Sequence, residues 1–273
     1  MAMPPYNPFA ADCSLRYVLI TGASMGIGAL FAREFAKRGR NLVLVARSAD
    51  AMHMLAEELR RSCGIRVEVY PADLRDPGSP ERILEFCHLR HTEVDLLINC
   101  AGLSRAGDFS DIPEEKLDEI VMVNMLTLAK LTRLFLPDMV QRKQGAIMNI
   151  ASLAGFQGVP GLGLYSATKS FIITLSEALH AELKKSGISV TAVCPGFTDT
   201  DIFEHSGHNR TQIRLPVYKP EVVVEAAIKG LMKNRRLVYP TLLDKVLVYS
   251  QRVASRGMAI GLAGFFAGIR SDR

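Results

Sequence analysis

Residues 17–28, YVLITGASMGIG, join a β-branched run to a glycine-rich turn and the start of a helix. Gly22, Gly26 and Gly28 suit a backbone that turns tightly and passes close to a ligand, because glycine has no Cβ. A helix beginning at about Ile27 would direct free N–H groups and a partial positive charge at the same point. The spacing G-x-x-x-G-x-G, which differs from the commoner G-x-G-x-x-G, favours a pyrophosphate turn, and a plain strand-to-helix turn is the alternative.

The rest of the chain repeats the alternation of short β-branched runs and helical stretches that this segment begins. The further strand candidates are residues 41–46, 65–71, 95–101, 146–151, 189–194 and 236–240. Strand and helix in alternation predict parallel strands joined by right-handed crossovers, with helices on both faces. The runs are apolar almost throughout, as strands of a sheet covered on both faces should be. The predicted fold class is α/β, a doubly wound (Rossmann) parallel sheet of about seven strands in a single domain.

We expect that domain to span residues 15–273, after a Pro-rich N-terminal arm of residues 1–14. Two segments inside it lack the alternation. Residues 197–219 show no clear period, and a loop of this length in a compact fold predicts a substrate lid. The C-terminal extension, residues 241–273, contains the apolar run MAIGLAGFFAGIR (258–270), which is too short to span a bilayer. We expect that run to pack in the core, at a subunit contact or on the substrate pocket, with peripheral membrane contact as the alternative.

Composition narrows the function classes. The net charge is +5, but the 33 basic and 28 acidic residues are mixed along the chain, which favours a solvated surface over nucleic-acid binding. Five cysteines without a C-x-x-C motif indicate free thiols in a reducing compartment. The arm has neither a basic region nor an apolar core of the kind found in secretory signals, so we expect a cytoplasmic protein. We expect no metal site, because His205 and His208 form an H-x-x-H without further ligands.

Arg47 stands where dinucleotide folds place the residue that selects the cofactor, at the end of the second predicted strand. An acidic residue there would bind both ribose hydroxyls of NAD. An arginine can instead hold a 2′-phosphate through charge-assisted hydrogen bonds, and Ser48 could add its hydroxyl. This predicts NADP(H) in preference to NAD, and a surface arginine without a role is the alternative.

Tyr165 and Lys169 are four residues apart at the start of a helical stretch, so they lie on one helix face. A neighbouring ammonium favours the phenolate, which would lower the tyrosine pKa from about 10. The pair alone could arise by chance. Ser152, however, directly follows the strand candidate 146–151, at the edge where open α/β sheets bind ligands, and Asn124 lies in the preceding helical stretch.

Together these motifs resemble the short-chain dehydrogenase/reductase family, from about Tyr17 to Tyr239. The family's T-G-x-x-x-G-I-G turn is present as Thr21 to Gly28, and its N-N-A-G turn as NCAG, with Cys100 replacing the second Asn.

The resemblance implies reversible hydride transfer between NADP(H) and a carbonyl or alcohol, with a catalytic tetrad of Asn124, Ser152, Tyr165 and Lys169. Tyr165 would give its proton to the developing alkoxide and Ser152 would hold the carbonyl oxygen. Lys169 would lower the tyrosine pKa and bind the nicotinamide ribose, and Asn124 would position a water that passes protons to solvent.

The resemblance also implies the cofactor contacts. Asp73 would bond the adenine amino group with Leu74 against the ring, and Thr200 would bond the carboxamide. Met25 occupies the position where some NADP-binding members carry a basic residue, so the choice of NADP rests on Arg47. The expected contacts are Gly22, Ser24, Met25, Gly26, Ile27, Gly28, Arg47, Ser48, Asp73, Leu74, Asn99, Ala101, Gly102, Tyr165, Lys169, Pro195, Gly196, Thr198 and Thr200.

The substrate is expected to be a medium-sized, apolar carbonyl or alcohol. The side chains that suggest this are Leu153, Phe156, Val159, Phe197, Ile202, Phe203, Ile213, Leu215, Pro216, Val217 and Tyr218. Members of the family commonly form dimers or tetramers through their long helices, so the resemblance implies a homodimer or homotetramer. Apolar faces on residues 116–140 and 164–185 are compatible with such a contact. The alternatives are a catalytically silent NADP(H)-binding regulatory protein and a nucleotide-sugar epimerase or dehydratase. The complete tetrad argues against the first and the short C-terminal part against the second.

Overall fold

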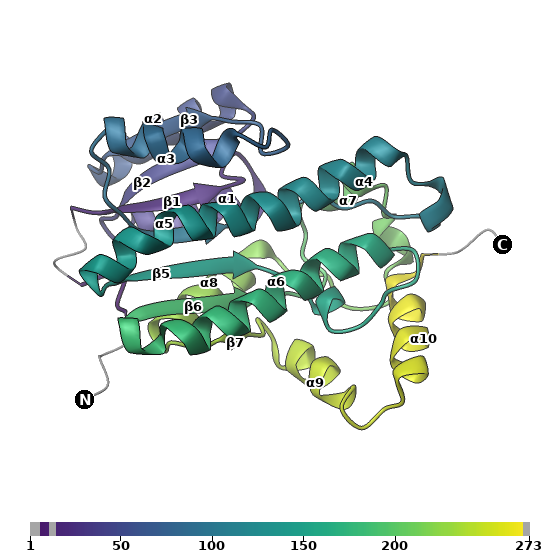
Figure 1. The fold of residues 1–273 in the computed structure, drawn as a ribbon. Helices are drawn as coiled ribbons and strands as arrows, with labels where there is room; N and C mark the ends of the chain where they lie inside the picture. The colour runs from purple at the N-terminus through teal and green to yellow at the C-terminus, as the bar shows by residue number, and fades with distance from the viewer. Residues whose placement is uncertain (1–5, 11–14, 270–273) are drawn as a thin grey trace.

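Seven parallel strands form one sheet in this computed structural model, which describes residues 6–10 and 15–269 (Figure 1). The strands are β1 (Tyr17–Thr21), β2 (Asn41–Ala46), β3 (Val67–Pro71), β4 (Val94–Asn99), β5 (Gly145–Ile150), β6 (Ile188–Val193) and β7 (Leu237–Val238). Their order is β3-β2-β1-β4-β5-β6-β7, so the chain changes direction across the sheet between β1 and β4. The predicted doubly wound fold is confirmed, and this switch point is where such sheets bind ligands.

Helices cover both faces of the sheet. On one face lie α1 (Gly26–Ala36), α2 (Ala49–Cys63) and α8 (Pro220–Met232), and on the other α3 (Ser79–Leu89), α4 (Glu114–Val121), α5 (Leu128–Arg142) and α6 (Gly163–Glu182). Successive strand residues feed opposite cores: Val18 of β1 packs with α1, whereas Leu19 packs on the α5 side. This two-sided burial explains why the strand runs are apolar throughout.

The long helix predicted at residues 116–140 is interrupted. Between α4 and α5 lies a six-residue π-helix, η3 (Met122–Thr127), which contains Asn124. The whole stretch Glu114–Arg142 is, among the described residues, the one helix apolar and long enough to cross a bilayer, yet it packs against α3 and α6. It therefore serves as a core helix here. The last strand is also shorter than predicted, with two residues in place of five.

The lid and the C-terminal extension are more ordered than the sequence suggested. The segment predicted as a lid, residues 197–219 and called the lid below, contains α7 (Ile202–Ser206) and the 3-10 turn η6 (Arg210–Gln212). The extension forms α9 (Leu242–Ser250), which was not predicted, and α10 (Arg256–Ala267), which covers the apolar run. The parts of the arm and extension at residues 1–5, 11–14 and 270–273 lie outside the described residues.

Candidate active site

The glycine turn between β1 and α1 has the geometry of a phosphate cradle. Gly22 has a φ of +68°, and a Cβ on Gly28 would lie 2.1 Å from the carbonyl oxygen of Gly22. Any side chain at either position would therefore strain or fill the turn. Met25, which precedes α1, makes no side-chain cap, and the first turn of the helix holds no acidic residue. The helix N-terminus is thus open to an anion, and the pyrophosphate of a dinucleotide fits there.

Thr21 links this turn to the end of β4. Its Oγ1 accepts hydrogen bonds from the backbone N–H groups of Cys100 at 3.0 Å and Ala101 at 3.1 Å. Because this hydrogen bond uses the backbone N–H of Cys100, it forms although a cysteine stands here in place of the family's asparagine. Burial raises the pKa of the Cys100 thiol to about 12, which keeps this side chain neutral beside the site.

A cavity of about 770 Å³ runs along the carboxyl edge of the sheet, from the glycine turn to α9 and α10. All the expected cofactor contacts line it except Asn99, and Ser152 lines it as well. Asn99 instead lies inside the fold, 3% exposed, where its Nδ2 donates to Asn149 Oδ1 at 2.9 Å and to Thr132 Oγ1 at 3.3 Å. Asn99 therefore joins β4 to β5 and α5 and does not face the cavity as expected.

Arg47 and Asp73 lie at one end of this cavity. Arg47 is exposed just after β2, and none of the ion pairs among the described residues involves its guanidinium. A cation in this state fits a 2′-phosphate. The carboxylate of Asp73, by contrast, is held by Arg75, which donates from Nε to Oδ1 at 3.0 Å and from Nη2 to Oδ2 at 2.6 Å. These hydrogen bonds lower the pKa of Asp73.

Sequence reasoning missed Arg75, although it stands two residues after Asp73 in the same segment. It also lines the cavity and donates from Nη1 to Glu119 Oε1 at 2.7 Å. The end of the cavity where we expected adenine therefore carries an Asp73–Arg75–Glu119 network rather than a free carboxylate.

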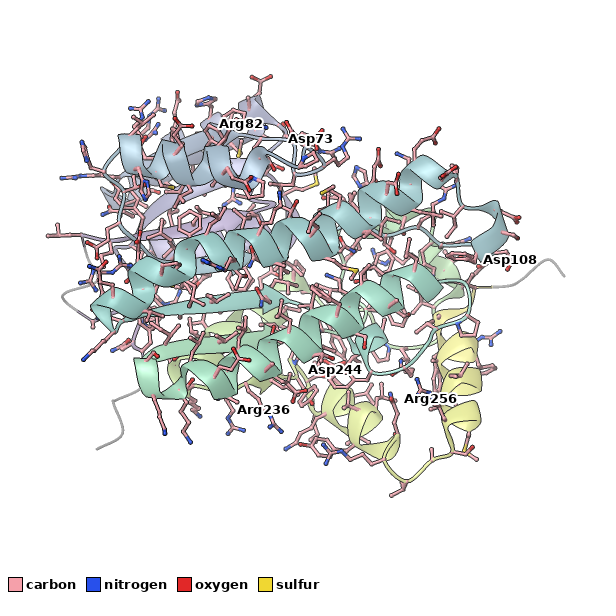
Figure 2. All side chains as sticks on the ribbon, in the orientation of Figure 1. Asp73, Arg82, Asp108, Arg236, Asp244 and Arg256 are labelled. Carbon is pink, nitrogen blue, oxygen red and sulfur yellow. The ribbon has the colours of Figure 1, made fainter. Side chains whose placement is uncertain are left out.

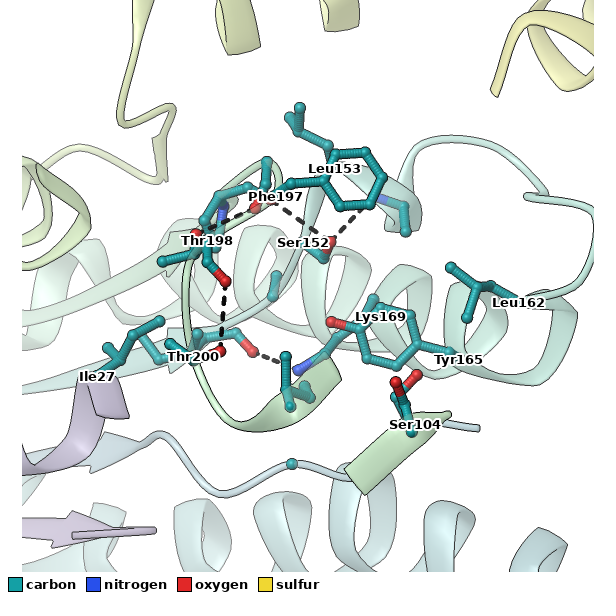
Figure 3. Close-up of a pocket in the computed structure, with 18 of the residues that line it drawn as sticks. Ile27, Ser104, Ser152, Leu153, Leu162, Tyr165, Lys169, Phe197, Thr198 and Thr200 are labelled. Carbon is teal, nitrogen blue, oxygen red and sulfur yellow. Dashed lines mark hydrogen bonds between the residues drawn. The ribbon is translucent and has the colours of Figure 1, made fainter. Parts of the chain in front are cut away.

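Ser152, Tyr165 and Lys169 converge in the middle of the cavity (Figure 3). The start of α6 presents Tyr165 and Lys169 on one face, with the Lys169 ammonium 5.5 Å from the centroid of the Tyr165 ring. The ammonium donates to the Ile150 carbonyl at the end of β5, at 2.7 Å. The Ser152 hydroxyl accepts from Ala154 N at 3.2 Å and lies 3.5 Å from the Pro195 carbonyl. Three expected catalytic side chains therefore meet at one point.

Burial controls the protonation of this group. It raises the pKa of Tyr165 to about 12, while hydrogen bonding with Ser152 acts in the opposite direction. It lowers the pKa of Lys169 to about 8. The rise in the pKa of Tyr165 is opposite to the lowering that the sequence suggested, because the cost of burying a phenolate exceeds the effect of the hydrogen bond with Ser152. Near neutral pH, Tyr165 is a phenol with a proton to give.

Asn124, the fourth expected member, lies behind the cavity wall and is fully buried. Its Oδ1 accepts from Leu103 N at 2.8 Å, and its Nδ2 donates to Leu103 O at 2.8 Å and to Thr168 Oγ1 at 3.0 Å. Every polar atom of the amide is thus used. In this structure Asn124 fastens the segment after β4 to α6, beside Lys169.

The other end of the cavity is apolar. Most of the predicted substrate side chains line it, but Phe156, Ile213 and Val217 do not. Sequence reasoning missed the contributions of α9 and α10, which include Leu243, Leu247, Leu262, Ala263 and Phe266. The T-x-x-D pattern at residues 241–244 could have predicted the start of α9, because it is typical of a helix N-terminus. Thr241 and Asp244 form a capping box in which each side chain accepts a hydrogen bond from the other's backbone N–H at 3.1 Å.

His205 and His208 do not come together as ligands. His205 Nδ1 bonds the Asp201 carbonyl at 2.7 Å, and the buried His208 bonds the Ala267 carbonyl at 2.8 Å. Within residues 6–10 and 15–269, no three metal-binding side chains form a group. Four cysteines there are free thiols, and Cys13 lies outside the described residues.

A parallel sheet with a glycine turn at its switch point, and a Ser–Tyr–Lys group in the same cavity, define a dinucleotide-binding oxidoreductase. A model of the short-chain dehydrogenase family matches residues 16–211. The chain belongs to this family and is an oxidoreductase of it, as the sequence motifs predicted.

Similar proteins are known in sequence and in structure. A very-long-chain 3-oxoacyl-CoA reductase from Anas platyrhynchos is 36% identical over 218 residues, which are 78% of this chain and 67% of that protein. A short-chain dehydrogenase from Sphingobium yanoikuyae in complex with NADPH is 37% identical with a TM-score of 0.80, covering 89% of this chain and 95% of its own. A bulky-bulky ketone specific alcohol dehydrogenase from Comamonas testosteroni is 33% identical with a TM-score of 0.74, covering 88% and 94%.

Proposed function

We propose that this protein is an NADP(H)-dependent oxidoreductase that interconverts a bulky, apolar carbonyl compound and its alcohol, with Tyr165 as the general acid and base. The observation that carries the proposal is the position of Tyr165. It stands beside Ser152 and Lys169 at the point where the glycine-turn half of the cavity meets its apolar half. A carbonyl held there would have a proton donor on one side and a cofactor site on the other.

The bound nicotinamide would supply or accept the hydride. In the reducing direction Tyr165, with a pKa of about 12, holds its proton at neutral pH and gives it to the carbonyl oxygen as negative charge develops there. The Ser152 hydroxyl would donate a hydrogen bond to the same oxygen. Lys169, with a pKa of about 8, is largely protonated at neutral pH and would stabilise the phenolate left behind.

Cofactor choice follows from Arg47. It faces the cavity after β2 without a carboxylate partner, and that place holds no acidic side chain for a ribose diol. The Sphingobium relative binds NADPH, which supports the same choice here. Each charge-assisted hydrogen bond from this arginine to a 2′-phosphate would strengthen the binding free energy of NADP(H) by roughly 1.5–3 kcal/mol.

The substrate class follows from the lining of the other end. Phe197, Phe203, Leu215 and Phe266 surround that space, with α9 and α10 completing its wall. A relative that acts on bulky ketones and another that acts on very-long-chain 3-oxoacyl-CoA agree with a large apolar substrate.

Tyr165→Phe tests the catalytic assignment. We expect kcat for the reduction of a bulky aromatic ketone, followed as NADPH oxidation, to fall by about 10²–10⁴ because the proton donor is lost. NADPH affinity, measured by calorimetry, should stay close to that of the wild type. Tyr70→Phe, which changes a tyrosine of β3 outside the cavity wall, is the matched control and should keep its rate.

Wild-type turnover by the Tyr165→Phe variant would refute the assignment. Tight NADPH binding by the wild type without turnover on a broad ketone and aldehyde panel would instead favour the silent regulatory protein.

Arg47→Leu tests the choice of cofactor. It should weaken the affinity for NADPH by at least about tenfold and leave the affinity for NADH nearly unchanged, because only the 2′-phosphate contacts are lost. Equal weakening of both cofactors would contradict this role.

A further inference from the structure

The C-terminal helices expose apolar side chains on their outer faces. On α9 these are Leu242, Val246 and Tyr249, and on α10 they are Met258, Leu262 and Phe265, with Val253 between the helices. Steps of three and four residues place each set on one helix face. Val253 is 90% exposed and Leu242 is 77% exposed. These seven side chains are called the apolar rim below.

The inner faces of the same helices already pack on the protein. Leu243 and Leu247 of α9, and Ala263 and Phe266 of α10, line the substrate cavity. A helix at the surface of a soluble protein normally turns a polar face outward, and a large exposed apolar patch marks an interaction site. Packing within this chain therefore accounts for the inner faces. On the apolar rim, Leu262 also reaches the substrate cavity, Tyr249 contacts Tyr239 and Phe265 contacts Arg214, yet all three remain exposed.

The charges around the apolar rim are almost all positive. Residues 242–269 contain one acidic side chain, the buried Asp244, and three exposed cations, Lys245, Arg252 and Arg256. Arg252 lies over the Tyr249 ring, with its Cζ 4.8 Å from the ring centroid. Cations that border an apolar helix face are the arrangement found in helices that lie in the headgroup layer of a membrane.

A second cavity, of about 940 Å³, extends this positive surface from α9 toward the edge of the sheet. The same three cations line it, together with Lys229, Lys233, Arg235 and Arg236. Its one carboxylate, Glu177, is paired with Arg236 at 3.2 Å. Figure 2 shows Arg236 and Arg256 in the lower half of the view, Arg236 to the left of α9 and Arg256 beside α10.

We infer that the face formed by α9, α10 and these cations docks on an anionic membrane surface. The apolar rim enters the boundary between headgroups and acyl chains, and the cations meet lipid phosphates. A second copy of the chain is a poorer occupant, because a symmetric contact would place the cations of one copy against the same cations of the other, and these would repel. The inference does not depend on the proposed chemistry, since its test measures binding and not turnover.

Sedimentation with sucrose-loaded vesicles tests the docking. The wild type should sediment with vesicles of phosphatidylcholine and phosphatidylglycerol, and much less with phosphatidylcholine alone. The variant Lys245→Glu, Arg252→Glu, Arg256→Glu should bind at least about 100-fold more weakly, at roughly fivefold for each cation. Charge reversals at Lys37, Arg61 and Lys184, which are exposed elsewhere, are the control and should cause a much smaller loss.

A second triple variant tests the apolar rim: Val246→Glu, Val253→Glu, Met258→Glu. It should also lose vesicle binding. Its control places the same acid at Leu15, Met54 and Leu89, which are 77%, 75% and 74% exposed. Neither triple changes a side chain that lines the substrate cavity, so reduction of a water-soluble ketone should be unchanged.

A direct readout uses the absence of tryptophan from the sequence. Val253→Trp supplies the one indole, whose emission should shift to the blue when anionic vesicles are added, while Met54→Trp should not shift. The inference is overturned if the wild type stays in the supernatant with anionic vesicles, or if rim and control variants lose binding equally. It is also overturned if the rim triple splits a dimer in size-exclusion chromatography, because the face would then join two copies.

Discussion

Lys169 illustrates what the site demands of a single residue. The residue is 4% exposed, and its ammonium donates a hydrogen bond to the Ile150 carbonyl at 2.7 Å. Burying a charge with so little compensation lowers its pKa to about 8 and costs folding free energy. A position that is unfavourable for folding and favourable for proton transfer is typical of a functional site.

The cost at Lys169 predicts a pH-dependent stability. Between pH 8 and the usual lysine pKa of 10.5, the unfolded chain binds a proton that the folded chain has lost. Raising the pH through this window therefore stabilises the wild type relative to Lys169→Met, by up to about 1.4 kcal/mol for each pH unit. Thermal melts of both proteins from neutral pH to about pH 10 would show this. Lys184→Met, at an exposed position, should show no such difference, and parallel melting curves for Lys169→Met would contradict the burial of a charged amine.

At the scale of elements, the π-helix η3 between α4 and α5 carries Asn124, which joins two other segments of the chain. The wider turn lets the side chain of Asn124 reach both backbone groups of Leu103 and the hydroxyl of Thr168. It thereby ties the loop after β4 to the helix that carries Tyr165 and Lys169. Insertions of this kind occur often at functional sites.

Asn124→Ala should destabilise the protein strongly. The change leaves the N–H and carbonyl of Leu103 without their partner, at about 1–3 kcal/mol for each buried group left unsatisfied. It also removes one of the two hydrogen bonds of the Thr168 hydroxyl, which still donates to the Tyr165 carbonyl at 2.8 Å. A net loss of about 3 kcal/mol would lower the midpoint of thermal unfolding by roughly 6–12 °C. Asn209→Ala, at the exposed start of η6, should cost only about 1 kcal/mol. Similar melting of the two variants would show that the amide does not hold this loop.

The elements also show how far a sequence can be read. The seven strands were located to within about two residues at most ends, because a sheet buried on both faces leaves an unmistakable apolar pattern. Ser152, Tyr165 and Lys169 were predicted to lie together because Ser152 follows a strand at the sheet edge, Tyr165 and Lys169 share one helix face, and all three match the family's motif. The π-helix, the burial of Asn99 and the raised pKa of Tyr165 were not predicted, since each depends on side chains distant in sequence.

At the scale of the whole molecule, the segment of residues 197–219 is hydrogen-bonded to the C-terminal extension. Its two ends are paired to each other, with Asp199 N donating to Tyr218 O at 2.8 Å and Tyr218 N to Phe197 O at 2.9 Å. Its middle is fixed to α10, because Arg214 N donates to Phe266 O at 3.0 Å and His208 Nε2 bonds the Ala267 carbonyl at 2.8 Å. Residues 197–219 and the extension therefore form one wall of the cavity that contains Tyr165.

His208 should make this wall sensitive to acid. Burial lowers its pKa below the usual 6.5, so the unfolded chain binds a proton more readily than the folded chain. Stability should consequently fall as the pH drops below about 6.5, by up to about 1.4 kcal/mol for each pH unit. The His208→Ala variant should lose this part of the pH dependence, whereas His205→Ala, at an exposed position, should keep it. Melting curves from pH 7 to about pH 5 would decide it, and equal slopes for wild type and His208→Ala would count against the assignment.

The bond between α10 and the lid has an evolutionary consequence. The residues of α10 that line the cavity belong to the same helix that is bonded to residues 197–219. If the proposed function holds, one exchange of sequence in α10 would alter both the fit of the substrate and the rate of its release. Grafting α10 from a relative would then transfer selectivity and turnover together. Among natural relatives, changes in the sequence of this helix should accordingly change substrate selectivity and turnover rate together, rather than one without the other.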